Sequence, residues 1–317
     1  MLPSGAGLQC RLRKTAPMRA IVLNSFRGLD ALELGEPADP TPGDGEELVR
    51  IRAAALGPWD LSAANGAFAA IGGTSEFPQV QGWDFAGEAG EGRRVLGFVA
   101  QPWMGMGTFA EQIAVPSALL APLPDALSFE EGGALSVCAL TARLLVDAAA
   151  VTEGHLVLVT GAAGMVGGFA AQLVRARGGR VVAAVRERDA DEARRLGADA
   201  VVGIGDDLEV EVRGQWQDGV DACLDTVGLG AAGLVCVRDG GAFVTSVPTA
   251  VPDGARGIAP QTVQVQPDAA ATAELAQRAT TGELTIRIAE TLPLERFRDG
   301  YARLERGGLH GKIVLVP

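Results

Sequence analysis

Leu156-Val-Leu-Val-Thr-Gly-Ala-Ala-Gly-Met-Val-Gly167 is the stretch of sequence that decides the fold. Its first five residues are apolar or β-branched, which is typical of a central parallel strand covered on both faces. Glycines follow at positions 161, 164 and 167, and a helix is predicted from about Met165 to Arg177. A second strand, Arg180–Val185, completes a βαβ unit of about thirty residues, the length that this unit requires. The stretch therefore predicts a parallel sheet covered by helices.

The glycine turn between the first strand and its helix predicts a site for a dinucleotide. Glycines let the backbone approach a pyrophosphate, whose charge then meets backbone amides and the positive end of the helix dipole. The strand, helix and second strand around it make this pattern more specific than three glycines alone. A tight turn without a ligand is the alternative. The predicted contacts in the turn are Gly161, Ala162, Ala163, Gly164, Met165, Val166 and Gly167.

Arg186-Glu187-Arg188 follows the second strand and indicates which dinucleotide is bound. Units that prefer NAD usually place an acidic residue here to hold the ribose hydroxyls, whereas a 2′-phosphate requires a guanidinium group. The planar fork of arginine matches phosphate oxygens, so Arg186, supported by Arg188, predicts NADPH. Glu187 is the contrary signal because it could hold a ribose. The two arginines could also be solvated loop charges.

Composition excludes several classes of function. The 317 residues are 48% hydrophobic and 21% charged, which are globular values. A net charge of −12 argues against a nucleic-acid or anionic-membrane surface. The cysteines lie far apart and the chain has 2 histidines, so no zinc-ligand spacing is present and no metal is predicted. No apolar run reaches the length of a membrane span, and no signal peptide is recognisable. We expect a cytoplasmic protein with reduced cysteines, Cys138 and Cys223 lying in its interior.

The order of elements predicts an α/β protein of two domains. Short strands separated by glycine and proline fill residues 18–132 and predict an antiparallel, partly barrel-like β domain. Strands and helices alternate in residues 133–264, which predicts a doubly wound parallel sheet of the Rossmann type. Residues 265–317 could return to the first domain, leaving a cleft between the two where ligands bind. Residues 1–17 are expected to form a flexible leader, and Met18 could be the true start.

Boundaries of the expected elements follow from the same patterns. The first domain should contain strands at 19–23, 47–54, 85–88, 94–99 and 108–115, and Ser128 should precede a helix from about 133 to 148. The second should add helices at 189–196 and 229–236 and strands at 200–203, 220–224 and 241–246. The tail should contain helices near 269–281 and 294–306 and strands near 286–289 and 311–316.

Short motifs along the chain resemble, in their order, those of the medium-chain dehydrogenase/reductase superfamily, specifically its zinc-free quinone oxidoreductase and enoyl reductase branch. They are Gly57-Pro-Trp-Asp60, Gly82-Trp-Asp-Phe-Ala-Gly87, Gly107-Thr-Phe-Ala-Glu111, the segment 122–131, Leu140-Thr-Ala142, the glycine turn, Leu196-Gly-Ala-Asp199, Asp225-Thr-Val-Gly228 and Gly311-Lys-Ile-Val-Leu315. The match runs over nearly the whole chain from Met18 to Pro317. It implies a GroES-like first domain and, by analogy, a homodimer joined along the edge of the cofactor-domain sheet.

The resemblance also implies which residues surround the nicotinamide. It places Thr141 beside the ring and Lys312 near the cofactor cleft, although Thr141 could only satisfy hydrogen bonds within a helix and Lys312 could be a solvated strand end. Asp225 is better explained as a residue that orders its loop than as an acid. The remaining residues implied along the cleft are Val227, Gly228, Ser246, Val247 and Pro248.

The chain departs from the family at three places. Segment 56–61 has neither the cysteine nor the histidine of zinc alcohol dehydrogenases, so zinc-dependent alcohol oxidation is not expected. Gly57 stands where quinone reductases commonly carry asparagine, which removes a side-chain contact to the cofactor ribose. The tyrosine often found after the Leu-Gly-Ala-Asp segment is absent, and Ile204 lies nearby. The cofactor contacts must therefore be partly rebuilt.

A site without a Lewis-acid metal suits acceptors that are already electrophilic, such as conjugated enones and quinones. We expect hydride transfer from the nicotinamide and stabilisation of the resulting enolate by hydrogen-bond donors before protonation. Asp60 is the best side-chain candidate for the proton donor, although it could instead orient a neighbour and water could serve. Tyr301 is expected to pack within a C-terminal helix.

Apolar residues on predicted loops of the first domain indicate the substrate. Such residues favour a small, flat, hydrophobic molecule, for example an aromatic polyketide or a quinone, and packing beneath the loops is the alternative. The predicted substrate contacts are Trp59, Phe68, Trp103 and Met104, with Met106 beside them.

Parts of the sequence are also compatible with two other functions. A short-chain dehydrogenase would begin with the glycine-turn strand and use a YxxxK pair, but about 150 residues precede this strand and Glu305 follows Tyr301 at the fourth place. A non-catalytic NADPH-binding sensor or scaffold of the same superfamily would need only the cofactor turn. Turnover of NADPH with enones and quinones distinguishes this sensor from a reductase.

Overall fold

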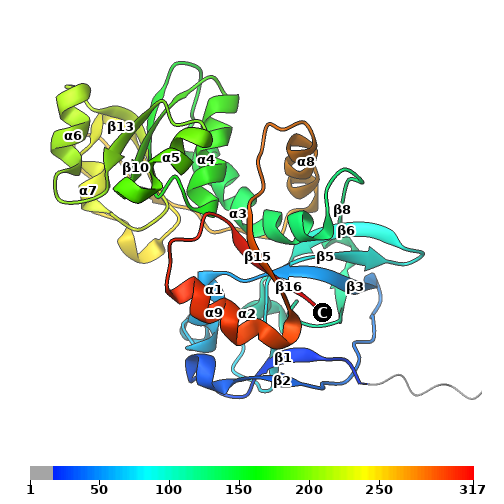
Figure 1. The fold of residues 1–317 in the computed structure, drawn as a ribbon. Helices are drawn as coiled ribbons and strands as arrows, with labels where there is room; N and C mark the ends of the chain where they lie inside the picture. The colour runs from blue at the N-terminus through cyan, green and yellow to red at the C-terminus, as the bar shows by residue number, and fades with distance from the viewer. Residues whose placement is uncertain (1–16) are drawn as a thin grey trace, which may run out of the picture.

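The computed structural model describes residues 17–317, which form two lobes joined by the long helix α3, Phe129–Ala148 (Figure 1). Pro17 alone of the expected leader lies within this range, so the prediction for residues 1–16 falls outside the described residues. The Ser128 side chain accepts a hydrogen bond from the amide of Glu131, and the Glu131 carboxylate accepts one from the amide of Ser128. The predicted cap is confirmed, and this capping box starts α3 four residues before the predicted helix.

The second lobe is a six-stranded sheet with neighbouring strands parallel throughout. Its strand order, β11-β10-β9-β12-β13-β14, reverses direction at β9, as in a doubly wound fold. The strands are β9 Leu156–Thr160, β10 Arg180–Val185, β11 Ala200–Gly203, β12 Val220–Asp225, β13 Val237–Thr245 and β14 Gln261–Thr262. The helices are α4 Met165–Ala176, α5 Ala190–Arg195, α6 Leu208–Gln215 and α7 Ala231–Leu234.

Alternating residues of β9 bury into two different cores. Val157 and Val159 belong to the cluster formed with α3 and α4. Leu156 and Leu158 belong to the cluster formed with α6 and α7. A strand covered on both faces needs apolar residues at every position, and all five residues of β9 are buried. The predicted Rossmann-type sheet is confirmed.

The first lobe is built mainly from antiparallel strands, and the C-terminus returns to it. Strand β16 pairs with β3 in antiparallel register, and β15 pairs with β16 in parallel. The sheet order is β15-β16-β3-β5-β6-β8, with β7 also on β3, while β2-β1-β4 forms a small separate sheet. The strands are β1 Ala20–Leu23, β2 Leu32–Gly35, β3 Glu46–Ala55, β4 Gln79–Val80, β5 Asp84–Ala89, β6 Arg93–Phe98, β7 Gln112–Pro116, β8 Ala121–Pro122, β15 Ile288–Pro293 and β16 Lys312–Val316.

Several short elements were predicted wrongly or missed. Helices α1 Pro58–Ala64 and α2 Gln101–Met104 occupy segments predicted as loops, because each has a proline in its first turn, where the missing N–H costs nothing. Helix α6 and strands β2, β4, β8 and β14 were not predicted. The tail contains α8 Ala269–Thr280 and α9 Phe297–Glu305, with a 3₁₀ turn before α9 where the helix was expected to begin. Within residues 17–317 no helix is long and apolar enough to span a membrane.

Candidate functional site

The glycine turn connects β9 to α4 at the point where the strand order of the Rossmann sheet reverses. Gly161 has φ +64°, a left-handed conformation that favours glycine. Gly167 lies so close to the Gly161 carbonyl that a Cβ atom there would overlap it. Gly164 is the N-cap of α4 and is exposed, and a Cβ atom on it would meet only the Gly161 oxygen, at 3.2 Å, among the described residues. The open helix N-terminus fits the pyrophosphate of a dinucleotide.

The carboxylate of Asp225 organises the neighbouring loop at the end of β12. Its oxygens accept hydrogen bonds from the Thr160 hydroxyl at 2.8 Å and from the amides of Gly228 and Gly230, each at 3.0 Å. The Ser246 amide at the end of β13 donates to the Asp225 carbonyl. Asp225 is thus committed to holding the loop, as the sequence indicated. Val227, Gly228 and the segment 246–248 therefore lie together at the carboxyl ends of β12 and β13, where doubly wound sheets bind ligands.

Arg287, a residue that the sequence did not indicate, holds the glycine turn from outside. It lies just before β15 and donates to the carbonyls of Ala163 at 2.8 Å and Gly164 at 2.6 Å, while pairing with Glu192 at 2.8 Å. Burial lowers its pKa to about 10, so it remains charged at neutral pH. A Cβ atom at Gly168 would come within 2.5 Å of the guanidinium. No local motif marks Arg287, because its partners are more than 90 residues away.

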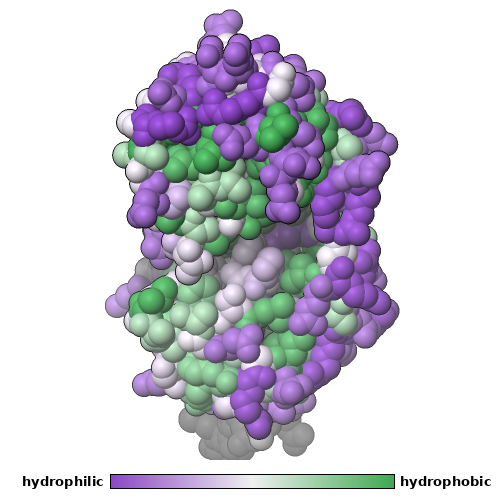
Figure 2. Space-filling model, turned by 90° about the vertical axis from the view of Figure 1, so that its left-hand side faces the viewer, coloured by the Kyte–Doolittle hydropathy of each residue, from purple (hydrophilic) through white to green (hydrophobic). Residues whose placement is uncertain are grey.

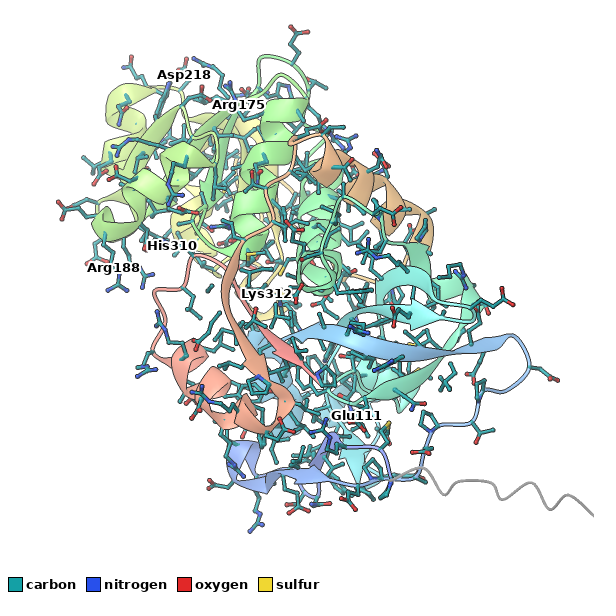
Figure 3. All side chains as sticks on the ribbon, turned by 45° about the vertical axis from the view of Figure 1, so that its right-hand side comes forward. Glu111, Arg175, Arg188, Asp218, His310 and Lys312 are labelled. Carbon is teal, nitrogen blue, oxygen red and sulfur yellow. The ribbon has the colours of Figure 1, made fainter. Side chains whose placement is uncertain are left out.

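Arg186 lies at the end of β10 with its guanidinium partly fixed. Its Nε pairs with Asp189 at 2.7 Å, and His310 from the C-terminal segment contacts the other Asp189 oxygen at 2.9 Å. Burial raises the pKa of Asp189, but the His310 and Arg186 contacts together lower it. Arg186, Glu187 and the carboxyl-terminal residues of β10 and β11 line a cavity of about 210 Å³. Arg188 is exposed on the same margin of the lobe (Figure 3).

Lys312 lies where the two lobes meet (Figure 3). Its side chain is 5% exposed, so the alternative of a solvated strand end is wrong. The ammonium donates to the Leu56 carbonyl at 3.0 Å, lies 3.6 Å from Asp84 and sits 4.3 Å from the centre of the Trp59 ring. Burial raises the pKa of Asp84 in spite of the nearby Lys312 and of the Val137 amide, which donates at 2.8 Å.

Thr141 lies on α3, is 8% exposed, and donates its hydroxyl proton to the Val137 carbonyl at 2.7 Å. The structure thus contains the intrahelical bond that was the alternative explanation for this residue. The hydroxyl oxygen keeps acceptor capacity, which a neighbouring ligand could use. Its role at the nicotinamide therefore stays a prediction.

Asp60 lies in the first turn of α1 and is 1% exposed. One carboxylate oxygen accepts a hydrogen bond from the Gly57 amide at 2.7 Å, and the other has no hydrogen-bond partner among the described residues. Burial raises the pKa of Asp60 to about 8, against the opposing effects of the Gly57 amide and Lys312. Tyr301 is fully buried, packs against Phe297 as predicted, and also leaves its hydroxyl unpartnered among the described residues.

Four aromatic rings form a cluster, which we name the aromatic wall: Trp59, Phe68, Trp83 and Trp103. Trp83 contacts the other three at centroid distances of 5.6–6.3 Å. Trp59 and Trp103 lie on helices, so the expectation that they sit on loops is wrong. Met104 and Met106 pack instead against the core of the first lobe. The sequence did not indicate Trp83 separately, because this residue stands inside the family motif Gly82–Gly87.

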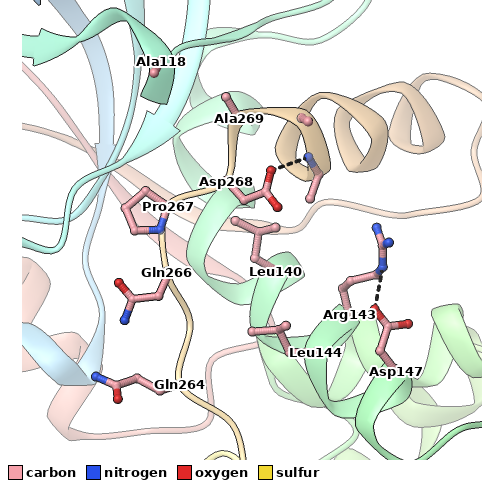
Figure 4. A pocket seen from close by; sticks show the side chains of 12 residues that line it. Ala118, Leu140, Arg143, Leu144, Asp147, Gln264, Gln266, Pro267, Asp268 and Ala269 are labelled. Carbon is pink, nitrogen blue, oxygen red and sulfur yellow. Dashed lines mark hydrogen bonds and ion pairs between the residues drawn. The ribbon is translucent and has the colours of Figure 1, made fainter.

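Figure 2 shows a hollow between the lobes with hydrophobic residues on both sides. A cavity of about 700 Å³ lies elsewhere, between one face of α3 and the segment leading into α8 (Figure 4). Leu140, Arg143, Leu144 and Asp147 line it from α3, at helical spacing. None of the site residues predicted from the sequence lines this cavity. The candidate site is therefore the junction of the glycine turn, Lys312 and the aromatic wall.

Comparison with known proteins identifies relatives of the whole chain and of its parts. A family model described as a zinc-binding dehydrogenase matches residues 196–315. The 2-methylene-furan-3-one reductase of Solanum lycopersicum is 29% identical over 95% of this chain and 79% of its own length. The NADPH-dependent alkenal/one oxidoreductase, chloroplastic, of Arabidopsis thaliana is 26% identical over 95% and 80%. The synaptic vesicle membrane protein VAT-1 homolog of Rattus norvegicus is 37% identical over 50% of this chain and 41% of its own length.

Among solved structures, the quinone oxidoreductase from Coxiella burnetii superposes with a TM-score of 0.84 and 24% identity, covering 95% of this chain and 99% of that one. Likeness at this level of identity shows the shared fold.

The description of the family model raises the question of zinc. Over residues 17–317 the structure brings together no group of three or more histidine, cysteine, aspartate or glutamate side chains that could hold a metal ion. The described residues therefore do not fit a zinc site, which needs at least three protein ligands of these types.

Proposed function

Because the chain belongs to the medium-chain dehydrogenase/reductase superfamily, we propose that it is an NADPH-dependent, zinc-independent oxidoreductase that reduces conjugated enones or quinones. A bound nicotinamide cofactor would supply the hydride. The names of the tomato and Arabidopsis relatives, an enone-type reductase and an NADPH-dependent alkenal/one oxidoreductase, support the acceptor class and the cofactor.

One observation carries the proposal: the glycine turn and three of the four rings of the aromatic wall belong to one continuous hydrophobic cluster. Ala162 and Ala163 of the turn and Trp83 are buried members of this cluster, and Trp59 and Phe68 pack against it. A cofactor on the turn would therefore be near a surface suited to a flat, hydrophobic acceptor. The cofactor would be held by the turn amides, by the loops after β12 and β13, and by Arg186.

Asp60 is the proposed proton donor. A carboxyl group with a pKa of about 8 is mostly protonated at neutral pH and can give its proton to an enolate. Its unpartnered oxygen is free, among the described residues, for a new contact. If Asp60 donates the proton, kcat falls as pH rises through about 8, and Asp60→Asn loses this dependence together with at least about tenfold in kcat. Unchanged turnover of Asp60→Asn would assign protonation to water.

Arg186 is proposed to select NADPH over NADH. With its Nε on Asp189, its two terminal nitrogens have no partner among the described residues and are available to a 2′-phosphate. Arg186→Ala should raise KM for NADPH at least about tenfold and leave KM for NADH nearly unchanged. Arg180→Ala, at the other end of the same strand and also exposed, is the matched control. Equal changes with both cofactors would refute the selection.

The decisive experiment is loss of NADPH absorbance with a panel that includes 4-phenylbut-3-en-2-one and 1,4-naphthoquinone. Consumption of NADPH with either acceptor supports the reductase. Tight NADPH binding without consumption across the panel would instead favour the non-catalytic sensor or scaffold. A cytoplasmic location and a homodimer joined along the edge of the cofactor-domain sheet are part of the proposal, and light scattering tests the dimer.

A further inference from the structure

Two hydrogen-bond donors of the aromatic wall have no acceptor. The indole Nε1 atoms of Trp59 and Trp83 are buried and make no hydrogen bond to any described residue. A buried indole N–H normally finds a partner, and an exception calls for a local explanation such as a missing ligand. Here the two exceptions occur on neighbouring rings whose centroids are 6.3 Å apart. The two unpaired donors therefore lie on rings that contact each other.

The position of Trp59 depends on Gly57. A Cβ atom on Gly57 would overlap the Cε2 and Cζ2 atoms of the indole, so the ring occupies the space that a side chain at position 57 would fill. Lys312 lies over the same ring and holds it from the side of β16. The Trp59 indole is thus fixed between the backbone at the start of α1 and a buried cation.

Trp83 is fixed more firmly. It is 6% exposed, contacts three aromatic rings, and its carbonyl accepts the Val99 amide at 3.0 Å. The next residue, Asp84, joins it to α3 through the Val137 amide and to Lys312. Donors held this rigidly need no reorganisation when charge develops on an acceptor, which is the property of an oxyanion-binding site.

We propose that the indole N–H groups of Trp59 and Trp83 together bind the carbonyl oxygen of the acceptor and stabilise the negative charge that forms on it. The proposal rests on the reductase function above. Hydride addition to the β-carbon forms a C–H bond and moves the C=C electron pair toward oxygen, giving an enolate. The two N–H groups donate hydrogen bonds to this oxygen without losing their protons. A proton added at the α-carbon completes the saturated ketone, and NADPH, the reductant, becomes NADP⁺.

Geometry distinguishes this role from packing alone. Packing explains why aromatic rings gather, but phenylalanine would pack without burying an unpaired donor. Phe68 does so in the same cluster, in contact with Trp83 and Trp103. The Lys312 ammonium adds positive potential beside Trp59, which favours an anionic oxygen there.

Kinetics of Trp→Phe variants test the proposal, since phenylalanine keeps an aromatic face and removes the N–H. Trp83→Phe and Trp59→Phe should each lower kcat for 4-phenylbut-3-en-2-one at least about tenfold, with KM for NADPH unchanged. Trp216→Phe, in the second lobe outside the aromatic wall, should leave kcat unchanged. If NADPH is consumed normally by both wall variants, the proposal is wrong while the reductase function stands.

Indole N–H resonances provide a readout that does not depend on turnover. The chain has 4 tryptophans, and the Phe variants assign the resonances of Trp59 and Trp83. With NADP⁺ present, the product ketone 4-phenylbutan-2-one should move both resonances downfield, and butylbenzene, which lacks the oxygen, should not. Equal shifts with the two ligands would overturn the proposal. If the ketone alone shifts the resonances but the protein consumes no NADPH, the proposed carbonyl-binding site stands and the proposed reductase function is refuted.

Discussion

Asp60→Asn should change how the stability of the protein depends on pH. The folded protein holds Asp60 with a pKa of about 8, whereas the ordinary value is 3.8. A group whose pKa is raised by folding stabilises the fold fully below the unfolded pKa, and this contribution is lost as pH rises through the folded pKa. The wild type should therefore lose stability between about pH 4 and about pH 8 because of this one carboxyl. Asparagine does not titrate, so the variant lacks that loss.

The magnitude follows from the two pKa values. A difference of about 4 pKa units, at about 1.36 kcal/mol per unit, corresponds to about 5 kcal/mol across the whole window. Within this window, the free energy of unfolding of the wild type should fall by about 1.4 kcal/mol relative to that of Asp60→Asn for each unit by which the pH rises. Asparagine keeps an oxygen for the Gly57 amide but introduces a donor, so its absolute stability at low pH should be below that of the wild type.

Urea unfolding followed by far-ultraviolet circular dichroism at pH 5, 6 and 7 measures this difference. Other titrating groups cancel when the variant is compared with the wild type at each pH, apart from those coupled to Asp60. Asp125→Asn is the matched control, because its side chain is 100% exposed. Its curve should stay parallel to that of the wild type. Parallel curves for Asp60→Asn would refute the assignment of a buried, protonated carboxyl.

Three further changes test other parts of the site. Arg287→Gln removes the guanidinium from the Ala163 and Gly164 carbonyls and should raise the Kd for NADPH at least about tenfold in a fluorescence titration, so an unchanged Kd would show that the turn holds itself. Lys312→Met leaves the Leu56 carbonyl unpaired and should lower the free energy of unfolding by about 2 kcal/mol, whereas an unchanged urea midpoint would contradict its buried bond. Burial raises the pKa of Cys138 to about 11, so this thiol should react with a disulfide reagent only as the protein unfolds, and fast labelling of the native state would contradict it.

The Rossmann half of the fold could be predicted from the sequence because its signals are local. The strand Leu156–Thr160 is apolar at nearly every position, and the glycine turn follows directly, so pattern and structure agree. Asp225 could be assigned to its loop for the same reason: its carboxylate accepts hydrogen bonds from four backbone amides, all within the five residues that follow it. Short-range chemistry of this kind is visible in the printed order of residues.

The missed parts depend on contacts between distant residues. Arg287 is one of many arginines until the fold brings it against Ala163, 124 residues away. Gly57-Pro58 is also a turn signal, so the sequence predicts a loop where α1 begins; in the structure the buried Asp60 accepts a hydrogen bond from the Gly57 amide and the segment is helical. Gly57 and Trp59 form a matched pair that no spacing rule connects, since only the folded geometry shows that the ring fills the missing side chain's place.

The C-terminal return, residues 287–312, connects the parts of the candidate site. Arg287 holds the glycine turn, His310 contacts the carboxylate that fixes Arg186, and Lys312 holds the Leu56 carbonyl and the Trp59 ring. The Lys312 amide also donates to the Arg287 carbonyl at 2.9 Å, which joins the two ends of this segment. This one segment thus contacts the three parts of the proposed site: the part for the pyrophosphate, the part for the adenosine and the part for the acceptor. Hydride transfer requires close approach of the hydride donor and the acceptor. Among residues that do not themselves contact the cofactor, those of this segment should therefore have the most direct effect on the distance between donor and acceptor.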